Sequence, residues 1–216
     1  NAAAAGDTVL VSPGVYVENL VINGKAIALA SVGGPSVTTI DGGMVGAVVQ
    51  IGSVQDYAAG LSGFTIENGL GLSTSLGDPD PGGIRLSHAS VTIRNCRIRN
   101  CIGGDALTPS GFPGSAPGQA GAGGIGMFQS FPRIEDCEIT GNQGGLGTIT
   151  LAQIFPTLPP QVVVSRPGTG GIHARRVFFS AQPLGFELSL KRCLIGGNSG
   201  GDGAGGVFTP QEQGGV

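Results

Sequence analysis

A short pattern recurs four times along the chain and constrains its fold more than any other feature. Each copy reads apolar residue, two mostly polar residues, Phe or Cys, any residue, Ile, and the copies begin at Leu61, Ile93, Ile134 and Leu190. A Gly-Gly-Ile or Gly-Gly-Val element precedes three copies and follows the last, at residues 82–84, 123–125, 170–172 and 205–207. Repeats of this kind indicate a solenoid, in which each repeat stacks on the next.

The repeat predicts which side chains line the interior. Two short strands joined by a polar bend fit the pattern, because the apolar residues then all point inward. Coils stacked at ~4.8 Å would place equivalent side chains above one another. We expect three such ladders: Leu61, Ile93, Ile134 and Leu190; Phe64, Cys96, Cys137 and Cys193; and Ile66, Ile98, Ile139 and Ile195.

The rest of the chain is interpreted as part of the same domain, 1–216, with less regular coils at 1–60 and regular coils at 61–208. Short strands are expected at 9–11, 20–22, 27–29 and 39–40. Asn23-Gly24 can form a hairpin turn, but a corner between coils is preferred.

Glycine and proline are abundant, at 42 and 14 residues, and they punctuate apolar β-branched runs. The spacing between Gly-Gly elements exceeds the ~20–25 residues that a bare coil needs. The excess must leave as loops, mainly at 69–81, 102–122 and 142–169, which would emerge from one corner, with a smaller insertion near 175–187.

The charge pattern excludes some functions. The net charge is −3 and the basic residues form no long run, so nucleic-acid binding is not expected. No apolar run approaches the ~20 residues that span a bilayer. The chain opens at Asn1 without Met, which is typical of a mature product or a fragment, and Gly206-Val207-Phe208 is similar to the start of another coil. Both ends are therefore expected to be uncapped.

The run from Ala5 to Asn19, Ala-Gly-Asp-Thr-Val-Leu-Val-Ser-Pro-Gly-Val-Tyr-Val-Glu-Asn, resembles the first coil of secreted bacterial proteins in the pectate-lyase-like superfamily. So do Thr-Ile-Asp-Gly-Gly at 39–43, Gly-Phe-Thr-Ile at 63–66 and the repeated Cys-x-Ile. The resemblance implies an all-β, right-handed, single-stranded parallel β-helix and an extracellular or cell-surface location. It says little about activity, because this fold carries lyases, hydrolases, esterases, epimerases, adhesins and phage spikes.

The resemblance also indicates which catalytic motifs to seek. Lyases of this fold would use a basic residue with calcium held by acidic residues, and hydrolases would use paired aspartates with Gly-His-Gly and Arg-Ile-Lys. The sequence has no Asp-Asp pair and no Gly-His-Gly, and Arg97-Ile98-Arg99 is only loosely similar to the basic motif. We identify no catalytic residue and no cofactor. Asp78 and Asp80 are weak candidates for calcium ligands, although a solvated Pro-rich turn is favoured.

Histidines and charged side chains are interpreted as surface features. His88 and His173 are isolated from other metal ligands, and alternation points His173 outward. Arg94, Glu135 and Lys191 would alternate in sign along one face, as would Arg97 and Glu138, so cross-strand charge pairing is the simple explanation. A shallow carbohydrate-binding face is the alternative.

The four cysteines are Cys96, Cys101, Cys137 and Cys193. Three of them occupy one inward position, where Cys behaves as a small hydrophobe. Buried free thiols are favoured, with a Cys96–Cys101 disulfide as the main competitor.

The loop at 148–165 is strongly apolar for a protruding segment. It either covers the flank of the solenoid or contacts a partner. The possible interface residues are Ile149, Leu151, Ile154, Phe155, Leu158, Val162, Val163 and Val164.

Two classes of function follow. The first is a secreted or cell-surface structural or adhesive protein that associates with itself or with another surface protein, with strand addition at the end coils as the means. The second is a carbohydrate-binding or polysaccharide-degrading module of the lyase or glycoside hydrolase kind.

Overall fold

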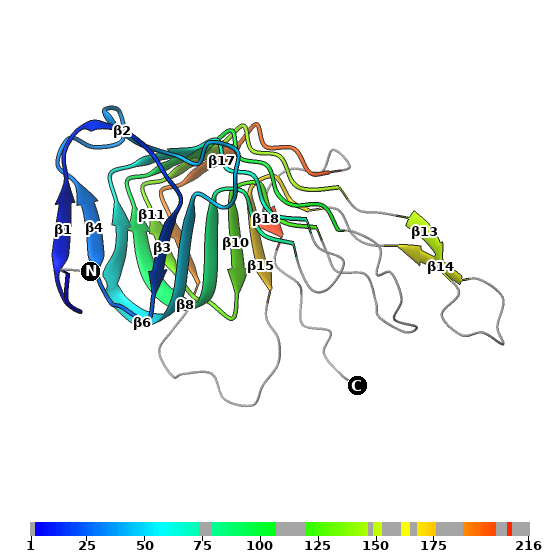
Figure 1. Cartoon of the computed structure of the whole chain (residues 1–216), viewed down its shortest axis with the longest axis horizontal. Helices are drawn as coiled ribbons and strands as arrows, with labels where there is room; N and C mark the ends of the chain where they lie inside the picture. Colours follow the sequence, from blue (N-terminus) through cyan, green and yellow to red (C-terminus); the bar gives the residue numbers. More distant parts are fainter. Residues whose placement is uncertain are drawn as a thin grey trace.

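The computed structural model describes residues 3–73, 79–106, 120–146, 149–152, 161–164, 168–175, 188–201 and 207–208. Within these ranges the chain is all-β, as the repeat predicts (Figure 1). The strands are β1 (Thr8–Val11), β2 (Gly14–Val17), β3 (Leu20–Asn23), β4 (Ala28–Ser31), β5 (Thr38–Asp41), β6 (Val49–Ser62), β7 (Thr65–Glu67), β8 (Ile84–Arg94), β9 (Arg97–Arg99), β10 (Ile125–Phe128), β11 (Arg133–Glu135), β12 (Glu138–Thr140), β13 (Ile149–Ala152), β14 (Gln161–Val164), β15 (Ile172–Arg175), β16 (Ser189–Lys191), β17 (Leu194–Gly196) and β18 (Val207–Phe208).

Parallel pairing arranges all of these strands except β13 and β14 on three faces. The first face contains β3, the start of β6 and β8, then β10, β15 and β18. The second contains β1, β4, the ends of β6 and β8, then β11 and β16. The third contains β2, β5, β7, β9, β12 and β17. Each turn of the chain therefore adds one strand to each face, and successive turns lie side by side (Figure 1).

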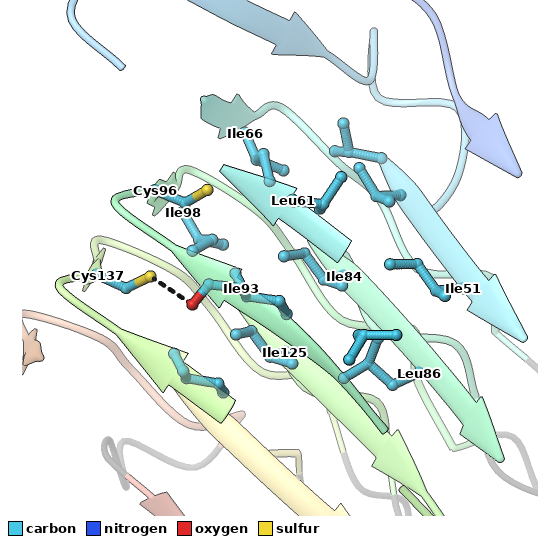
Figure 2. Packing of buried hydrophobic residues seen from close by; sticks show 14 of the residues in the cluster. Ile51, Leu61, Ile66, Ile84, Leu86, Ile93, Cys96, Ile98, Ile125 and Cys137 are labelled. Carbon is cyan, nitrogen blue, oxygen red and sulfur yellow. Dashed lines mark hydrogen bonds between the residues drawn. The ribbon is translucent and has the colours of Figure 1, made fainter. Parts of the chain in front are cut away.

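The registers confirm the three predicted ladders. Leu61, Ile93, Ile134 and Leu190 are paired in that order, as are Ile66, Ile98, Ile139 and Ile195. The Phe64 carbonyl accepts from Arg97 N–H, which places Cys96 beside Phe64. Ladder residues of the inner coils are at most 2% exposed, and Figure 2 shows several of them pointing into a shared interior. Burial of this continuous core is what stabilises the stack.

Left-handed backbone conformations stack at the three corners. The corner between the second and third faces has Gly63, Asn95, Asp136 and Arg192, with φ from 50° to 82°. The next corner has Asn68, Asn100, Gly141 and Gly197, and the remaining one has Gly24, Ser53, His88 and Gln129. Asn, Asp and Gly tolerate this conformation best, which explains the polar bend in each repeat. Asn23-Gly24 is therefore a corner, as predicted, because β3 pairs in parallel with β6.

Asn142 and Asn198 form a ladder of side-chain hydrogen bonds beside the Asn68 corner. Asn142 Oδ1 accepts from Cys101 N–H at 3.1 Å, and Asn142 Nδ2 donates to Ile98 O at 2.9 Å and to Asn198 Oδ1 at 3.0 Å. Asn198 Nδ2 donates to Ile139 O at 2.7 Å. These bonds satisfy backbone groups where the chain leaves the sheet. Cys101, Asn142 and Asn198 therefore occupy equivalent positions in successive coils.

The bases of the long loops stack on one another next to this corner. Isolated bridges join Leu70, Ile102, Gln143 and Ser199 in succession. Gly121 N–H donates to Gly104 O, and Gly145 N–H donates to Gly121 O, so outgoing and returning segments interleave. A Cβ on Gly121 would lie 2.2 Å from the Asp80 carbonyl oxygen, which explains glycine at this position. The described parts of the loops thus leave from one corner, as predicted.

Candidate functional site

Charged side chains on the outer faces pair largely with one another. Arg97 lies 3.5 Å from Glu138, confirming that predicted pair. On the second face Lys191 lies 3.9 Å from Glu135. Arg94 is in register with Glu135, as predicted, yet it forms no ion pair with the residues that the structure describes. Cross-strand charge pairing therefore explains most of the predicted alternation of charges, but it does not account for Arg94.

A hollow of about 470 Å³ lies on the second face beside Arg94. Its floor is made of small side chains because outward positions of β4 and the end of β6 carry Ala28, Ala30, Gly60 and Ser62. Thr8, Thr92, Arg133 and Glu135 also line it. Small residues in two adjacent coils, with long polar ones in the coils that follow, produce the depression.

A bulge in β6 forms the wall of this hollow. Gln55 pairs with Ser90 and Gly60 with Thr92, so residues 56–59 of β6 face the single residue Val91 of β8. A Cβ on Gly60, whose φ is 135°, would lie 1.9 Å from the Thr92 carbonyl oxygen. The chain can approach this closely only with glycine at position 60, and the extra residues turn Tyr57 outward over the next coils.

Tyr57 and Arg133 meet across the hollow. The Tyr57 hydroxyl donates to Phe131 O at 3.0 Å, and Thr92 Oγ1 donates to Tyr57 O at 2.7 Å. The Arg133 guanidinium carbon lies 3.8 Å from the Tyr57 ring centroid. This cation–π contact holds the guanidinium group over the ring.

The Tyr57–Arg133 pair was not predicted from the sequence, although the spacing between repeat elements differs at this point. Val49 to Leu61 spans three more residues than Ile84 to Ile93 or Ile125 to Ile134. A longer interval between two elements of one repeat indicates an insertion in the intervening corner.

A second candidate lies where the returning loop meets the first face. Asp80, one of the two weak calcium candidates, lies 2.7 Å from Arg85. Burial raises the pKa of Asp80, and the Arg85 charge opposes that shift. Arg85, Gly126 and His173 are successive outward residues on adjacent strands. Pro81 fills the space over Gly126, where a Cβ would lie 2.9 Å from the Pro81 side chain.

The interpretation of His173 as a surface residue is wrong. Its side chain points outward, as alternation predicts, but the residue is only 8% exposed. Burial lowers the pKa of His173 to about 4, so the imidazole is neutral at pH 7. Alternation gives the direction of a side chain relative to the sheet, and it does not tell what lies over the outer face. His88 is exposed, as expected, and its ring packs edge-to-face with Phe128, with 5.3 Å between the ring centroids.

The cysteines are free thiols in the structure, which favours the first of the two interpretations. Cys96, Cys101 and Cys137 are buried, and Cys193 is partly exposed at the last regular coil. Burial raises the pKa of Cys101 to about 12, and a hydrogen bond with Cys96 together with burial raises the pKa of Cys137. Thiols with raised pKa values are weak nucleophiles, so Cys101 and Cys137 act as core residues. The pKa of Cys96 is lowered by its hydrogen bond with Cys137, but its side chain is likewise buried in the core.

Outward positions of the first coil, formed by β1, β2 and β3, carry exposed aliphatic side chains. Leu10, Val15, Val17 and Val21 are 67%, 69%, 71% and 68% exposed. Residues in register with one another on successive strands form an outward column, and these columns carry charged residues in later coils. The column of Leu10 contains Arg94 and Glu135, and the column of Val15 contains Arg97 and Glu138. The column of Val17 contains Glu67 and Arg99, and that of Val21 contains Arg85. Each of the three faces of the first coil thus presents at least one exposed aliphatic side chain, alongside the exposed polar residues Thr8 and Asn23.

The proposed interface segment contains an antiparallel hairpin. Ile149 pairs with Val164, Thr150 with Val163 and Leu151 with Val162 in β13 and β14. Figure 1 shows this hairpin extending away from the stacked coils. Ile154, Phe155 and Leu158 lie outside the described residues, as does Asp78, so their predicted roles stay predictions.

No protein-family model, curated protein or solved structure matches the chain. Within the described ranges there is no helix long and apolar enough to cross a membrane. Across the same part of the chain, no group of three or more His, Cys, Asp and Glu residues is arranged to hold a metal ion.

Proposed function

We propose that this chain is a secreted or cell-surface protein with a structural or adhesive role, built as a right-handed parallel β-helix, and that it self-associates through its first coil. The observation that carries the proposal is the set of exposed Leu and Val side chains in the first coil, in columns whose middle coils carry charged residues. Charged outer faces suit contact with water, whereas a ring of exposed aliphatic side chains is typical of an interface.

Two physical effects favour a second copy of the chain as the partner. Burying the apolar side chains would contribute about 25 cal/mol per Å² of area removed from water. The strands of this coil also pair on one side only within the described chain, β1 with β4, β2 with β5 and β3 with β6. An edge strand that carries exposed aliphatic side chains favours strand addition by another chain.

The test is the concentration dependence of molar mass, measured by light scattering after size exclusion. We expect the native chain to form dimers or larger assemblies, and the double variant V15K/V17K to remain monomeric. Leu194 provides the matched control because it lies in the Val15 column at the opposite end of the stack and is 61% exposed. L194K should assemble like the native chain. A native chain that is monomeric at all concentrations would refute self-association.

A second candidate function is a carbohydrate-binding or polysaccharide-degrading module, and the junction of Asp80, Arg85 and His173 supports it. An acid with a raised pKa beside an arginine, near a buried neutral histidine, is typical of functional sites. We expect such a module to retain acidic polysaccharides on affinity gels, with or without release of unsaturated sugars. R85Q should lose this retention, and R99Q, on the third face, should keep it. Absence of binding across a broad polysaccharide panel would exclude this candidate.

A further inference from the structure

The hollow beside Tyr57 has features that neither proposed function uses. The bulge at residues 56–59 and Gly60 place an aromatic ring over a floor of small side chains. Hydrogen bonds hold Tyr57 at both its backbone and its side chain. Thr92 Oγ1 donates to the Tyr57 carbonyl, and the Tyr57 hydroxyl donates to the Phe131 carbonyl. The wall is therefore fixed in position by hydrogen bonds to the next two coils.

Two guanidinium groups line this hollow, and neither forms a salt bridge with a carboxylate in the described ranges. Arg94 at the end of β8 and Arg133 at the start of β11 both line the hollow, and the two strands are adjacent. Arg133 is in register with Thr92, which precedes Arg94 by two residues. Diagonal neighbours of this kind lie ~7–8 Å apart, within reach of one anionic group for long side chains. Neither arginine forms an ion pair within the part of the chain described. Glu135, which also lines the hollow, lies 3.9 Å from Lys191. The pKa of the neighbouring Asp136 is lowered by its hydrogen bond with Arg192 and also by the Arg94 charge. Arg94, Arg133 and Lys191 therefore outnumber the two carboxylates here. The hollow is thus locally positive on a chain of net charge −3.

The Tyr57 contact determines how Arg133 can bind. The Arg133 guanidinium carbon lies over the Tyr57 ring, 3.8 Å from its centroid. A guanidinium stacked on an aromatic face keeps its N–H edge available, and this planar fork matches a carboxylate with two parallel hydrogen bonds. The same contact occupies one face of the Tyr57 ring, which is then closed to a stacking sugar ring. The geometry therefore favours recognition of carboxylates on flexible side chains over stacking of sugars.

We propose that this hollow binds an acidic segment of a partner protein, with Arg94 and Arg133 as the anchors for Asp or Glu carboxylates. Tyr57 acts as a positioning residue that orients Arg133. The small floor residues Ala28 and Ser62 leave room for the backbone of the bound segment.

Fluorescence anisotropy with the full chain tests the proposal. One labelled peptide alternates glutamate and alanine, and the second has glutamine in place of each glutamate. We expect the glutamate peptide to bind at least tenfold more tightly at low salt, with the difference shrinking as salt screens the charges. R94Q and R133Q should each weaken binding about fivefold. R99Q is the matched control, because Arg99 pairs with Glu67 on the third face and should not affect binding.

Two further measurements keep the proposal falsifiable. S62E places a carboxylate next to Arg94 without removing either arginine, and it should block the peptide while circular dichroism and the unfolding midpoint stay native. An unlabelled oligouronate serves as the competitor from the other chemical class. Equal binding of the two peptides, an equal loss in R99Q, or tighter binding of the oligouronate than of the glutamate peptide would overturn the proposal.

Discussion

Replacing Asn142 with alanine removes one side chain that serves three coils of the stack. Its loss leaves the Cys101 N–H without its partner, and it removes one donor each from the Ile98 carbonyl and Asn198 Oδ1. Asn142 is 1% exposed, so water cannot simply replace these bonds. A buried group left unsatisfied costs ~1–3 kcal/mol and each further hydrogen bond contributes ~1 kcal/mol, so we expect a loss of ~3 kcal/mol in the free energy of unfolding.

Urea unfolding followed by circular dichroism measures this loss. With an m-value of ~2–3 kcal/mol/M, a loss of ~3 kcal/mol lowers the midpoint by about 1–1.5 M. Asn23, an exposed residue at the end of β3, gives the matched control, and N23A should change stability by less than ~0.5 kcal/mol. If N142A loses less than ~1 kcal/mol, or no more than N23A, the hydrogen-bonded ladder does not stabilise the stack as we argue.

Two more predictions concern positions that the sequence left unexplained. His173 has its pKa lowered from 6.5 to about 4, so between these values the unfolded chain binds more protons than the folded chain. Stability should therefore fall by up to ~3 kcal/mol as pH drops from 7 to 4, and H173Q should abolish that part of the slope in denaturant midpoints. G60A should lower the free energy of unfolding by ~3 kcal/mol or more, because the added Cβ meets the Thr92 carbonyl. G196A adds a Cβ in open space and should leave the free energy of unfolding nearly unchanged in the same assay. Equal effects of the two substitutions would contradict the close approach at Gly60.

Much of the strand register was predictable because the repeat is periodic. Leu61, Ile93 and Ile134 occupy equivalent places in their repeats, and stacking then fixes which of them are neighbours. The same logic placed Cys137 between Cys96 and Cys193. The less regular N-terminal strands were only approximated: β2 was missed and the length of β6 was not foreseen, since neither segment matches the repeat.

The candidate sites were less predictable because they depend on contacts across the outer faces. Tyr57 lies 74 residues from Phe131, and only the bulge in β6 brings its hydroxyl to that carbonyl. His173 was assigned the right direction and the wrong environment, since segments far away in the sequence decide what covers an outward side chain.

The sequence by itself determined the inward ladders, the polar corners and the corner from which the loops leave, because these features repeat with the coil and need only local patterns and stacking. Tertiary structure decided the Tyr57–Arg133 contact, the burial of His173 and the change from aliphatic to charged side chains along each column. The physical reason is the same in each case: a period specifies which residues are equivalent, whereas a functional surface arises where equivalent positions carry different side chains or where an insertion breaks the period.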